Sequence, residues 1–259
     1  EVGDPPASAA TIAVARSHSP PPARPLRWSG GCVVRGWPVG AGPAAGEVAG
    51  AWGRWRRLDR GGHADVRSRV NRADEQGRLW TYLPYGPFDN LTSYRVWLEG
   101  VAGREDPMFF AIIDGKGRAV GVASFLRIDP LAGSIEVGHL AFSPAAQTTT
   151  VATEAMSLMM RTVFGELGYR RYEWKCDALN AASRRAAQRF GFVYEGTFRQ
   201  AKVVKGRNRD TAWFSITDAD WPRLAAAYDR WLAPDNFDAE RRQLLALSKL
   251  TLPDAPSTP

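Results

Sequence analysis

The chain has 259 residues, of which 44% are hydrophobic, 24% charged and 11% aromatic, a composition typical of water-soluble globular proteins. It excludes collagen-like, coiled-coil and fully disordered chains. The sequence contains no run of about 18 apolar residues that would span a membrane, and the N-terminus lacks the continuous apolar segment of a secretory signal. We therefore expect a soluble, intracellular protein, located in the cytoplasm and without a membrane partner.

The formal net charge of +7 is unevenly distributed along the chain. Residues 1–60 carry eight Lys or Arg and four Asp or Glu, whereas residues 61–259 carry 26 and 23. A nucleic-acid-binding surface needs clustered cations, so no nucleic-acid partner is expected. The two cysteines, Cys32 and Cys176, are too few for a disulfide framework. His18, His63 and His139 lack metal-ligand spacing, so no metal is expected.

The N-terminal segment has a composition unsuited to a packed core. Gly, Pro, Ala and Ser supply 30 of the first 50 residues, which predicts a disordered tail over residues 1–48. We expect a folded domain over residues 49–232 and a C-terminal helical extension and tail over 233–259. The part before residue 108 is predicted to be rich in helix, with a polar helix over 61–79. Asp89 or Asn90 is suited to cap a helix that continues through Leu98.

From Met108 onward the pattern changes to strands and then alternates with helices. Apolar runs predict strands over 109–113, 119–128 and 135–142, and a buried strand over 169–176. Helical spacing predicts helices over 152–167 and 180–190. A strand pair over 192–201 and 211–216 follows, and then amphipathic helical segments over 222–232 and 239–250. A strand–helix–strand unit among antiparallel strands predicts an α/β, or α+β layered, fold with a mixed sheet.

The segment 143–154 follows a predicted strand directly and begins a helix. Free backbone N–H groups at such a helix entrance are suited to bind phosphate, and the consecutive threonines Thr148, Thr149 and Thr150 add hydroxyl groups. The alternative is that these threonines only cap the helix. The second entrance, at Asn180, is open to the same two interpretations, since Asn is a preferred cap.

Several short motifs occur in an order and spacing that together resemble the GCN5-related N-acetyltransferase superfamily. The similarity is to the branch that acetylates the N-termini of ribosomal proteins, and it covers about residues 50–232. The motifs are Glu136-Val137-Gly138-His139, Thr153-Glu154-Ala155, Leu167-Gly168-Tyr169-Arg170-Arg171, Asn180-Ala181-Ala182-Ser183-Arg184, Gly191-Phe192, Glu195-Gly196 and Arg209-Asp210.

The resemblance implies a mostly antiparallel mixed sheet of six to seven strands, flanked by helices and splayed between its two central strands. It implies acetyl-CoA as co-substrate, with the pantetheine arm in the gap between those strands. The cofactor-binding residues carried over are Ala141, Phe142 and Ser143 along the arm, Gln147, Thr148, Thr149, Thr150, Val151 and Ala152 at the pyrophosphate, and Asn180, Ser183 and Arg184 on the second helix. Thr150 occupies a position where the family pattern has glycine.

The chemistry of amide formation sets the requirements for catalytic residues. The amine attacks as the free base, so a proton must leave, and the departing thiolate benefits from a proton donor. Glu136 and His139 are rival candidates for the base, and Ser183 is the candidate donor. Strand alternation puts Glu136 on one face of the sheet, with Val137 and His139 on the other. Glu154 is expected to stabilise the first turn of its helix.

The acceptor side of the site is represented by an aromatic cluster. Trp80, Tyr82, Tyr85 and Phe88 either wall a substrate pocket or form the core beneath the first helices. Trp174 is expected in the core, and Cys176 is not expected to act as a nucleophile. The sequence predicts a direct N-acetyltransferase acting on a peptide N-terminus or a small amine, as a monomer or homodimer. The alternative is an acyl-CoA-binding regulatory module without turnover.

Overall fold

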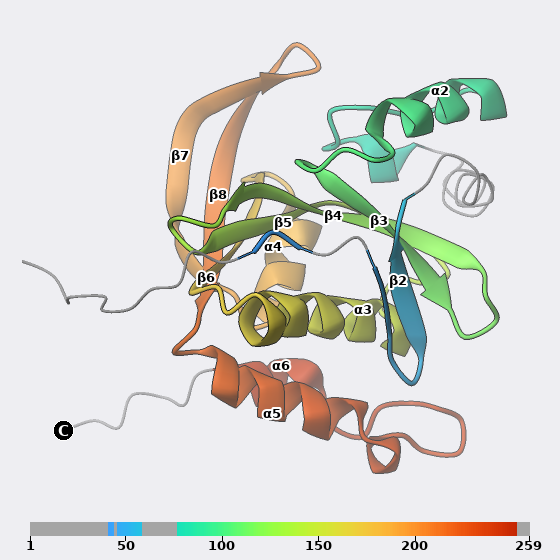
Figure 1. Cartoon of the computed structure of the whole chain (residues 1–259), viewed down its shortest axis with the longest axis vertical. Coiled ribbons are helices and arrows are strands. Elements are labelled where there is room, and N and C mark those ends of the chain that lie inside the picture. The colour runs from blue at the N-terminus through green and yellow to red at the C-terminus, as the bar shows by residue number, and fades with distance from the viewer. Residues whose placement is uncertain (1–40, 44–45, 59–76, 253–259) are drawn as a thin grey trace, which may run out of the picture. The chain divides into compact units, whose positions relative to one another are not determined.

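The computed structural model describes residues 41–43, 46–58 and 77–252 (Figure 1). Most of the predicted N-terminal tail and of the predicted helix over 61–79 lies outside these residues. The predicted domain boundaries at 48 and 232 therefore stay predictions. In the described part of the chain, no helix is both long and apolar enough to cross a membrane.

The described residues form one mixed sheet with the strand order β1-β2-β3-β4-β5-β6-β8-β7. All neighbouring pairs are antiparallel except β5 and β6, which are parallel. This confirms the predicted fold class. The strands are β1 (Glu47–Ala49), β2 (Gly53–Arg57), β3 (Met108–Asp114), β4 (Ala119–Asp129), β5 (Ser134–Phe142), β6 (Arg171–Asp177), β7 (Val193–Val204) and β8 (Arg207–Thr217).

The sheet has eight strands, where about six to seven were expected. The first two, β1 and β2, form a hairpin in the part of the chain that was expected to be rich in helix. β1 is a three-residue edge strand, in a Gly- and Ala-rich stretch that carries little strand signal of its own. Pairing with β2 supplies the order that local propensity does not predict.

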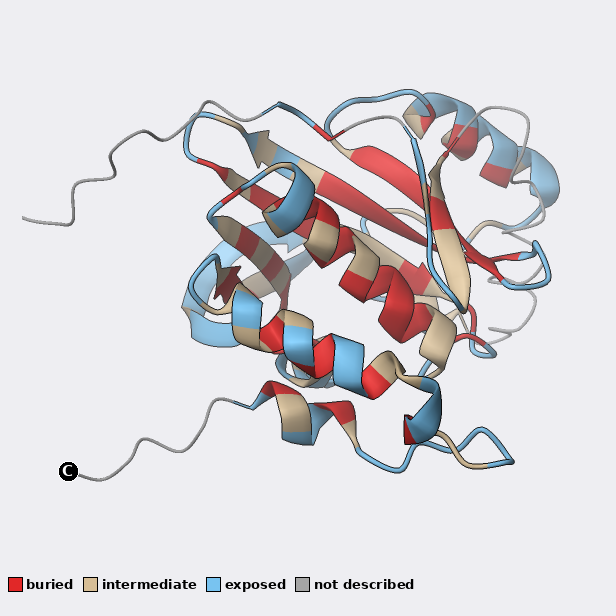
Figure 2. Ribbon diagram, turned by 60° about the horizontal axis from the view of Figure 1, so that its bottom comes forward, coloured by how far each residue is buried: buried red, intermediate tan, exposed pale blue. Residues whose placement is uncertain are grey.

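The helices cover the two faces of the sheet unequally. Buried residues of α3, α4 and α5 pack with one face, and α2 packs with the β2–β5 half of the other. Figure 2 shows the buried side of these helices turned toward the sheet. The helices are α2 (Leu91–Val101), α3 (Thr150–Arg161), α4 (Ala181–Arg189), α5 (Trp221–Leu232) and α6 (Leu247–Thr251), with short turns η1 (Arg78–Trp80), η2 (Thr162–Glu166) and η3 (Pro234–Asn236).

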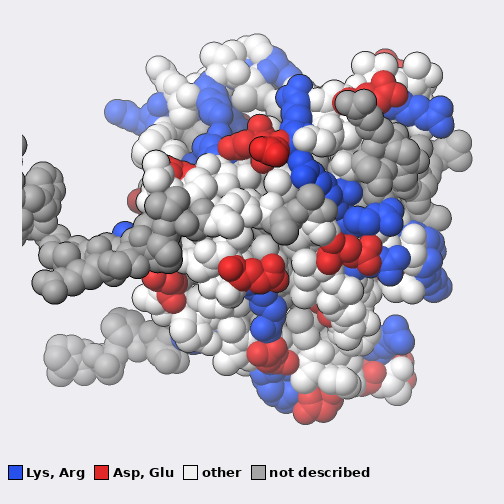
Figure 3. Space-filling view, in the orientation of Figure 1, with Lys and Arg blue, Asp and Glu red and all other residues white. Residues whose placement is uncertain are grey.

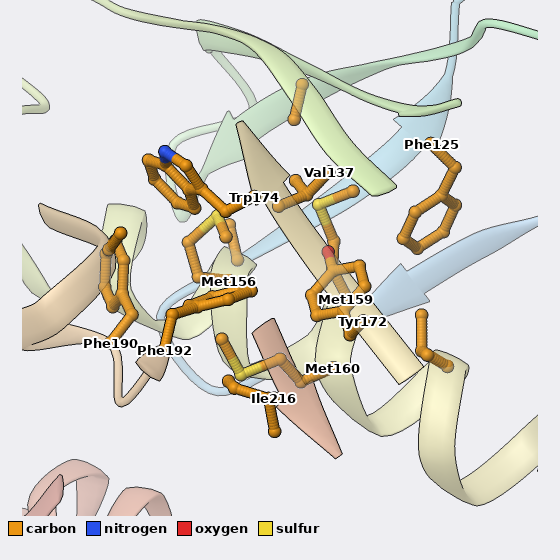
Figure 4. Close-up of a cluster of buried hydrophobic side chains, with 14 of the residues drawn as sticks. Phe125, Val137, Met156, Met159, Met160, Tyr172, Trp174, Phe190, Phe192 and Ile216 are labelled. Atoms are coloured by element: carbon orange, nitrogen blue, oxygen red, sulfur yellow. The ribbon is translucent and has the colours of Figure 1, made fainter. Parts of the chain in front are cut away.

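The larger core lies between the sheet and α3. Met156, Met159 and Met160 of α3 are fully buried against Tyr172 and Trp174 of β6 (Figure 4). Unbranched methionine side chains fill irregular space between large rings. The aromatic side chains of β6 therefore pack this central strand of the sheet tightly against the helical layer.

The two central strands separate along their length, as predicted. β5 and β6 pair only from Ser134 opposite Arg171 to Val137 opposite Trp174. Beyond this point β5 continues beside β4, and β6 continues beside β8. Backbone groups of β5 after Val137 consequently face a gap where a neighbouring strand would otherwise lie.

The helix predicted over 239–250 is wrong for most of its length. Only Leu247–Thr251 is helical. The buried side chain of Asn236 donates to the carbonyl of Trp231 and accepts from the N–H of Leu245. The carboxylate of Asp238 binds Arg242. Such side chain–backbone bonds stabilise a loop in competition with helix.

Glu154 has a different partner from the one expected. It is the fifth residue of α3, beyond the first turn, and its buried carboxylate accepts the N–H groups of Ala51, Trp52 and Gly53, each at 2.8 Å. A Cβ on Gly50 would lie 2.3 Å from the Glu154 carboxyl carbon. The glycine thus allows the β1–β2 turn to close over the carboxylate.

Replacing Glu154 tests this anchor. Glu154→Ala leaves three backbone donors without their charged acceptor, and we expect a loss of about 3 to 5 kcal/mol in the free energy of unfolding. Urea denaturation measures this loss. Glu99→Ala is the matched control, because Glu99 is exposed on α2. Equal stability of the two variants would contradict the anchoring role.

Candidate active site

A pocket of about 250 Å³ lies where β5 and β6 separate. One wall is formed by Leu79, Tyr82, Leu83 and Pro84, which precede α2. The floor is formed by Glu136–Leu140 of β5 and Trp174–Asp177 of β6. Asn180 and Ser183 contribute from the start of α4. The β7–β8 hairpin closes the remaining side with Lys202, Val204 and Arg209.

The pocket brings together the predicted catalytic residues Glu136, His139 and Ser183, together with Asn180 and Tyr82. These side chains come from β5, α4 and the loop before α2, which are far apart in the sequence. The pocket does not include the predicted cofactor residues from Ala141 to Ala152, which continue from the end of β5 into α3. The described residues contain no group of three or more His, Cys, Asp or Glu placed to hold a metal ion.

Glu136 is a buried carboxylate whose two oxygens are both bound by cations. Arg127 donates from Nε and Nη2 at 2.7 and 3.0 Å, and Lys175 Nζ lies 2.9 Å from Oε2. Lys175 also lies 2.7 Å from Glu173 and 3.7 Å above the ring of Trp213. Glu136 therefore holds Arg127 and Lys175 in place at the pocket floor.

The two acidic residues flanking Lys175 are register partners, directly opposite on β5 and β6. Burial raises the pKa of Glu173, but hydrogen bonds from Lys175 and Arg171 outweigh burial and lower it. Glu173 is thus held in the charged form by the neighbouring cations. Arg127 and Lys175 were not identified from the sequence. The signal for Lys175 is the alternation along Arg171–Asp177, where every second side chain is buried and the charged side chains lie on the other face.

His139 lies on the opposite face from the one predicted. Val122 pairs with Ala141 and Ser124 with Gly138, so β5 has one residue more than β4 between these positions. His139 has the left-handed φ of +53°, as in a β-bulge. Its ring lies 5.5 Å from Tyr85 and 4.9 Å from Phe109, on the face that α2 covers. Simple alternation fails because the bulge inserts a residue.

The environment of His139 favours the neutral imidazole. Burial, and then the charges of Arg127, Lys202 and Arg209, lower its pKa to about 4. Its buried Nδ1 has no hydrogen-bond partner among the described residues. Near neutral pH this side chain is therefore an uncharged hydrogen-bonding group.

Ser183 is oriented by two neighbours. Its backbone N–H donates to the side chain of Asn180, which caps α4, and its Oγ accepts from Trp174 Nε1 at 2.9 Å. Because the indole occupies an acceptor lone pair, the Ser183 hydroxyl proton points elsewhere, and the neighbouring Cys176 sulfur is within its reach. Trp174 belongs to the core, as predicted, and also positions Ser183. Burial raises the pKa of the Cys176 thiol, which disfavours the thiolate.

The threonine segment forms the entrance to α3. Thr149 caps the helix by accepting from Ala152, and Thr148 has the left-handed φ of +60°. Thr150, which replaces the family's glycine, is the first helical residue and requires no left-handed backbone. The first-turn N–H groups of Thr150 and Val151 have no intrahelical acceptor. This arrangement fits an anionic group of a cofactor.

The other predicted cofactor residues have structural partners. Gln147 donates to the carbonyl of Phe142, and Ala141 and Ser143 are buried. Arg184 donates to the carbonyl of Ala178 and lies over the ring of Tyr194.

The aromatic cluster divides between the two roles considered for it. Tyr82 lines the pocket, and its hydroxyl donates to the carbonyl of Leu179 before α4. Trp80 is buried, and it packs with Tyr85 and Phe88 beneath α2. Trp80, Tyr85 and Phe88 are not among the residues that line the pocket, because they form the core below this wall.

Lys205 ties the β7–β8 turn to the segment before α2 that also carries the opposite wall of the pocket. Its ammonium donates to the carbonyls of Trp80 at 2.9 Å, Gly86 at 2.8 Å and Tyr85 at 3.4 Å. For this region the sequence predicts only the strand pair over 192–201 and 211–216. The contact depends on two segments about 120 residues apart, so local pattern carries no signal for it.

Lys175→Met tests the buried ion pairs. The substitution keeps the length of the side chain but leaves Glu136 and Glu173 facing each other with fewer counter-charges. We expect a loss of about 3 to 5 kcal/mol in unfolding free energy, measured by urea denaturation. Lys116→Met, in the exposed β3–β4 turn, is the control. A loss at Lys175 no greater than at Lys116 would argue against this network.

The His139 imidazole should titrate far below the ordinary value of 6.5. Its folded-state pKa is about 4, so between pH 6.5 and 4 the unfolded chain binds more protons than the folded chain. The contribution of this group to folding stability is therefore lost as pH falls through that window. NMR titration measures the pKa directly. The unfolding free energies of wild type and His139→Gln should therefore become closer as pH falls, because only the wild type loses this contribution. An imidazole pKa near 6.5 would contradict the assignment.

Comparison with known proteins identifies the family. The acetyltransferase (GNAT) domain description matches residues 56–193. A GCN5-related N-acetyltransferase from Brucella melitensis is 41% identical, with a TM-score of 0.80, over 84% of this chain and 99% of that one. A probable GNAT-family acetyltransferase from Chromobacterium violaceum is 38% identical, with a TM-score of 0.68, over 79% of this chain and 100% of that one.

One curated relative matches over a shorter region. The ribosomal-protein-serine acetyltransferase of Escherichia coli is 31% identical over 85 residues, which are 33% of this chain. The chain covers only about half, 47%, of that relative's length. Together with the fold, the matches confirm the family resemblance seen in the motifs. The chain belongs to the GCN5-related N-acetyltransferase (GNAT) family.

Proposed function

We propose that this protein transfers the acetyl group of acetyl-CoA directly to a primary amine. The observation that carries the proposal is the pocket at the separation of β5 and β6, where Glu136, His139, Asn180 and Ser183 meet. Family membership supports acetyl transfer. The acceptor is a peptide N-terminus or a small amine, and the partial match to a ribosomal-protein acetyltransferase favours a peptide N-terminus.

The structure offers two features that suit acetyl-CoA. Backbone groups of β5 after Val137 are not paired with β6, and they are suited to hydrogen-bond the amides of an extended pantetheine arm. The free N–H groups at the start of α3, at Thr150 and Val151, are suited to the pyrophosphate. Asn180 and Ser183 lie across the gap on α4.

The residues around the gap divide the chemical work. Ser183 supplies a proton to the departing sulfur, because Trp174 fixes its oxygen and leaves its hydroxyl proton available. The neutral imidazole of His139 takes up the proton that the attacking amine loses as the C–N bond forms and the C–S bond breaks. Exchange with solvent then returns a proton to Ser183 and removes one from His139. Glu136 acts through Arg127 and Lys175 as a positioning residue, since cations occupy both of its oxygens.

Binding and turnover are measured separately to test the proposal. Calorimetric titration with acetyl-CoA and CoA should give micromolar affinity, and a thiol-release assay on a panel of peptide and small amines should show turnover with one class. Ser183→Ala should lower kcat by about 100-fold, the usual contribution of a positioned proton donor, with little change in the KM for the amine.

Two further variants separate catalysis from stability. Trp174→Phe keeps the Ser183 hydroxyl but removes the indole N–H that donates to it. The kcat of this variant should lie between those of wild type and Ser183→Ala. Ser248→Ala, exposed on α6, should behave as wild type. Absence of acetyl-CoA binding would refute the proposal. Binding without turnover on any amine would favour the alternative, a catalytically silent acyl-CoA-binding regulatory module.

A further inference from the structure

The charges that line the pocket do not balance. Arg127 and Lys175 are paired with Glu136, and the Asp177 carboxylate accepts from the N–H of Leu179. Lys202 and Arg209 also line the pocket. Among the described residues, neither has an ion pair or a side-chain hydrogen bond, and Arg209 Nε is buried without a partner.

Lys202 and Arg209 are direct register partners across β7 and β8. Like charges placed opposite each other in an antiparallel ladder destabilise it. Partial burial, and then the charges of Arg127 and Arg209, lower the pKa of Lys202. Figure 3 shows basic side chains gathered between the β7–β8 hairpin and α2 on this face. The hairpin thus holds two cations together without an anion from its own chain.

These cations surround the reacting centre. Arg127, Lys202 and Arg209 all act electrostatically on His139, which lines the floor of the same pocket. An anionic group bound by Lys202 and Arg209 would consequently lie on the acceptor side, close to the amine.

We propose that the acceptor is an amine that carries a carboxylate or phosphate group near its nitrogen, and that Lys202 and Arg209 bind this group. This inference rests on the proposed transferase function and specifies its substrate class. It disfavours polyamines, because a second ammonium group would meet uncompensated cations. Nearby positive charge also lowers the pKa of an ammonium group, so the bound acceptor loses its proton more easily.

The phosphates of the donor are the other possible source of the anion. If these bound Lys202 and Arg209, substitution would weaken CoA binding and leave acceptor preference unchanged. An acceptor anion and a CoA phosphate share the same chemistry. They are distinguished by whether substitution of Lys202 or Arg209 weakens binding of the acceptor or of CoA, so the affinities for both ligands must be measured.

The test uses the full chain and acceptors that differ only in charge. Ser-Glu-Glu-amide, Ser-Gln-Gln-amide and Ser-Lys-Lys-amide share one N-terminal amine, and phosphoethanolamine is compared with ethanolamine. We expect kcat/KM to be about tenfold or more higher for each anionic acceptor than for its neutral counterpart, the effect of a charge-assisted hydrogen bond. Arg209→Gln and Lys202→Gln should remove this preference, mainly by raising the KM for the anionic acceptors, with the Kd of CoA unchanged.

Arg207→Gln is the matched control, because Arg207 is exposed on the same hairpin and does not line the pocket. It should keep the wild-type preference. Equal kcat/KM for acidic and neutral acceptors, or higher values for basic ones, would overturn the inference. The inference would also be overturned if Arg209→Gln raised the Kd of CoA but left the preference for anionic over neutral acceptors unchanged.

Calorimetric titration of the acidic and neutral peptides tests anion binding without turnover. Tighter binding of the acidic peptide, lost in Arg209→Gln, supports the inference even if no acetyl transfer occurs. Equal affinity for the two peptides overturns it. Failure of the transferase proposal would instead appear as absent acetyl-CoA binding, which this titration does not depend on.

Discussion

Lys175 joins the two central strands at the end of their paired region. Glu136 and Glu173 lie directly opposite each other on β5 and β6, where two carboxylates repel. The Lys175 ammonium lies within 2.9 Å of one and 2.7 Å of the other. One residue later the ladder ends and the strands separate. A buried ion group therefore bridges the two strands at the closed end of the gap.

The gap and the β-bulge at His139 act on the same stretch of β5. The bulge turns His139 toward the face that carries Glu136, while Val137 still packs with the larger core. One short segment thus anchors the strand and presents two polar side chains to the pocket. Burial, and then the cations around it, keep the imidazole neutral. In the proposed reaction, surrounding positive charge would favour proton release from the amine as well as any single base.

The sequence predicts features that are encoded locally. Asn90 begins α2 with a capping box, and the helix of Asn180 and Ser183 lies where its spacing indicates. Features that depend on distant pairing are missed. The bulge at His139 arises from its register with β4, and Glu154 binds a turn about 100 residues earlier in the chain. The segment 239–250 has helical periodicity, yet the buried Asn236 side chain bonds its backbone instead.

The hairpin that carries Lys202 and Arg209 shows how structural and ligand-binding demands combine. Two facing cations weaken the ladder, but the adjoining turn is held by Lys205, which binds three carbonyls of the opposite wall. The turn is therefore stabilised at its tip, and the charges nearer the pocket stay without a partner of their own among the described residues. A ligand anion there would relieve repulsion already present in the folded chain. Binding energy would then come from electrostatic imbalance built into the hairpin as well as from new contacts.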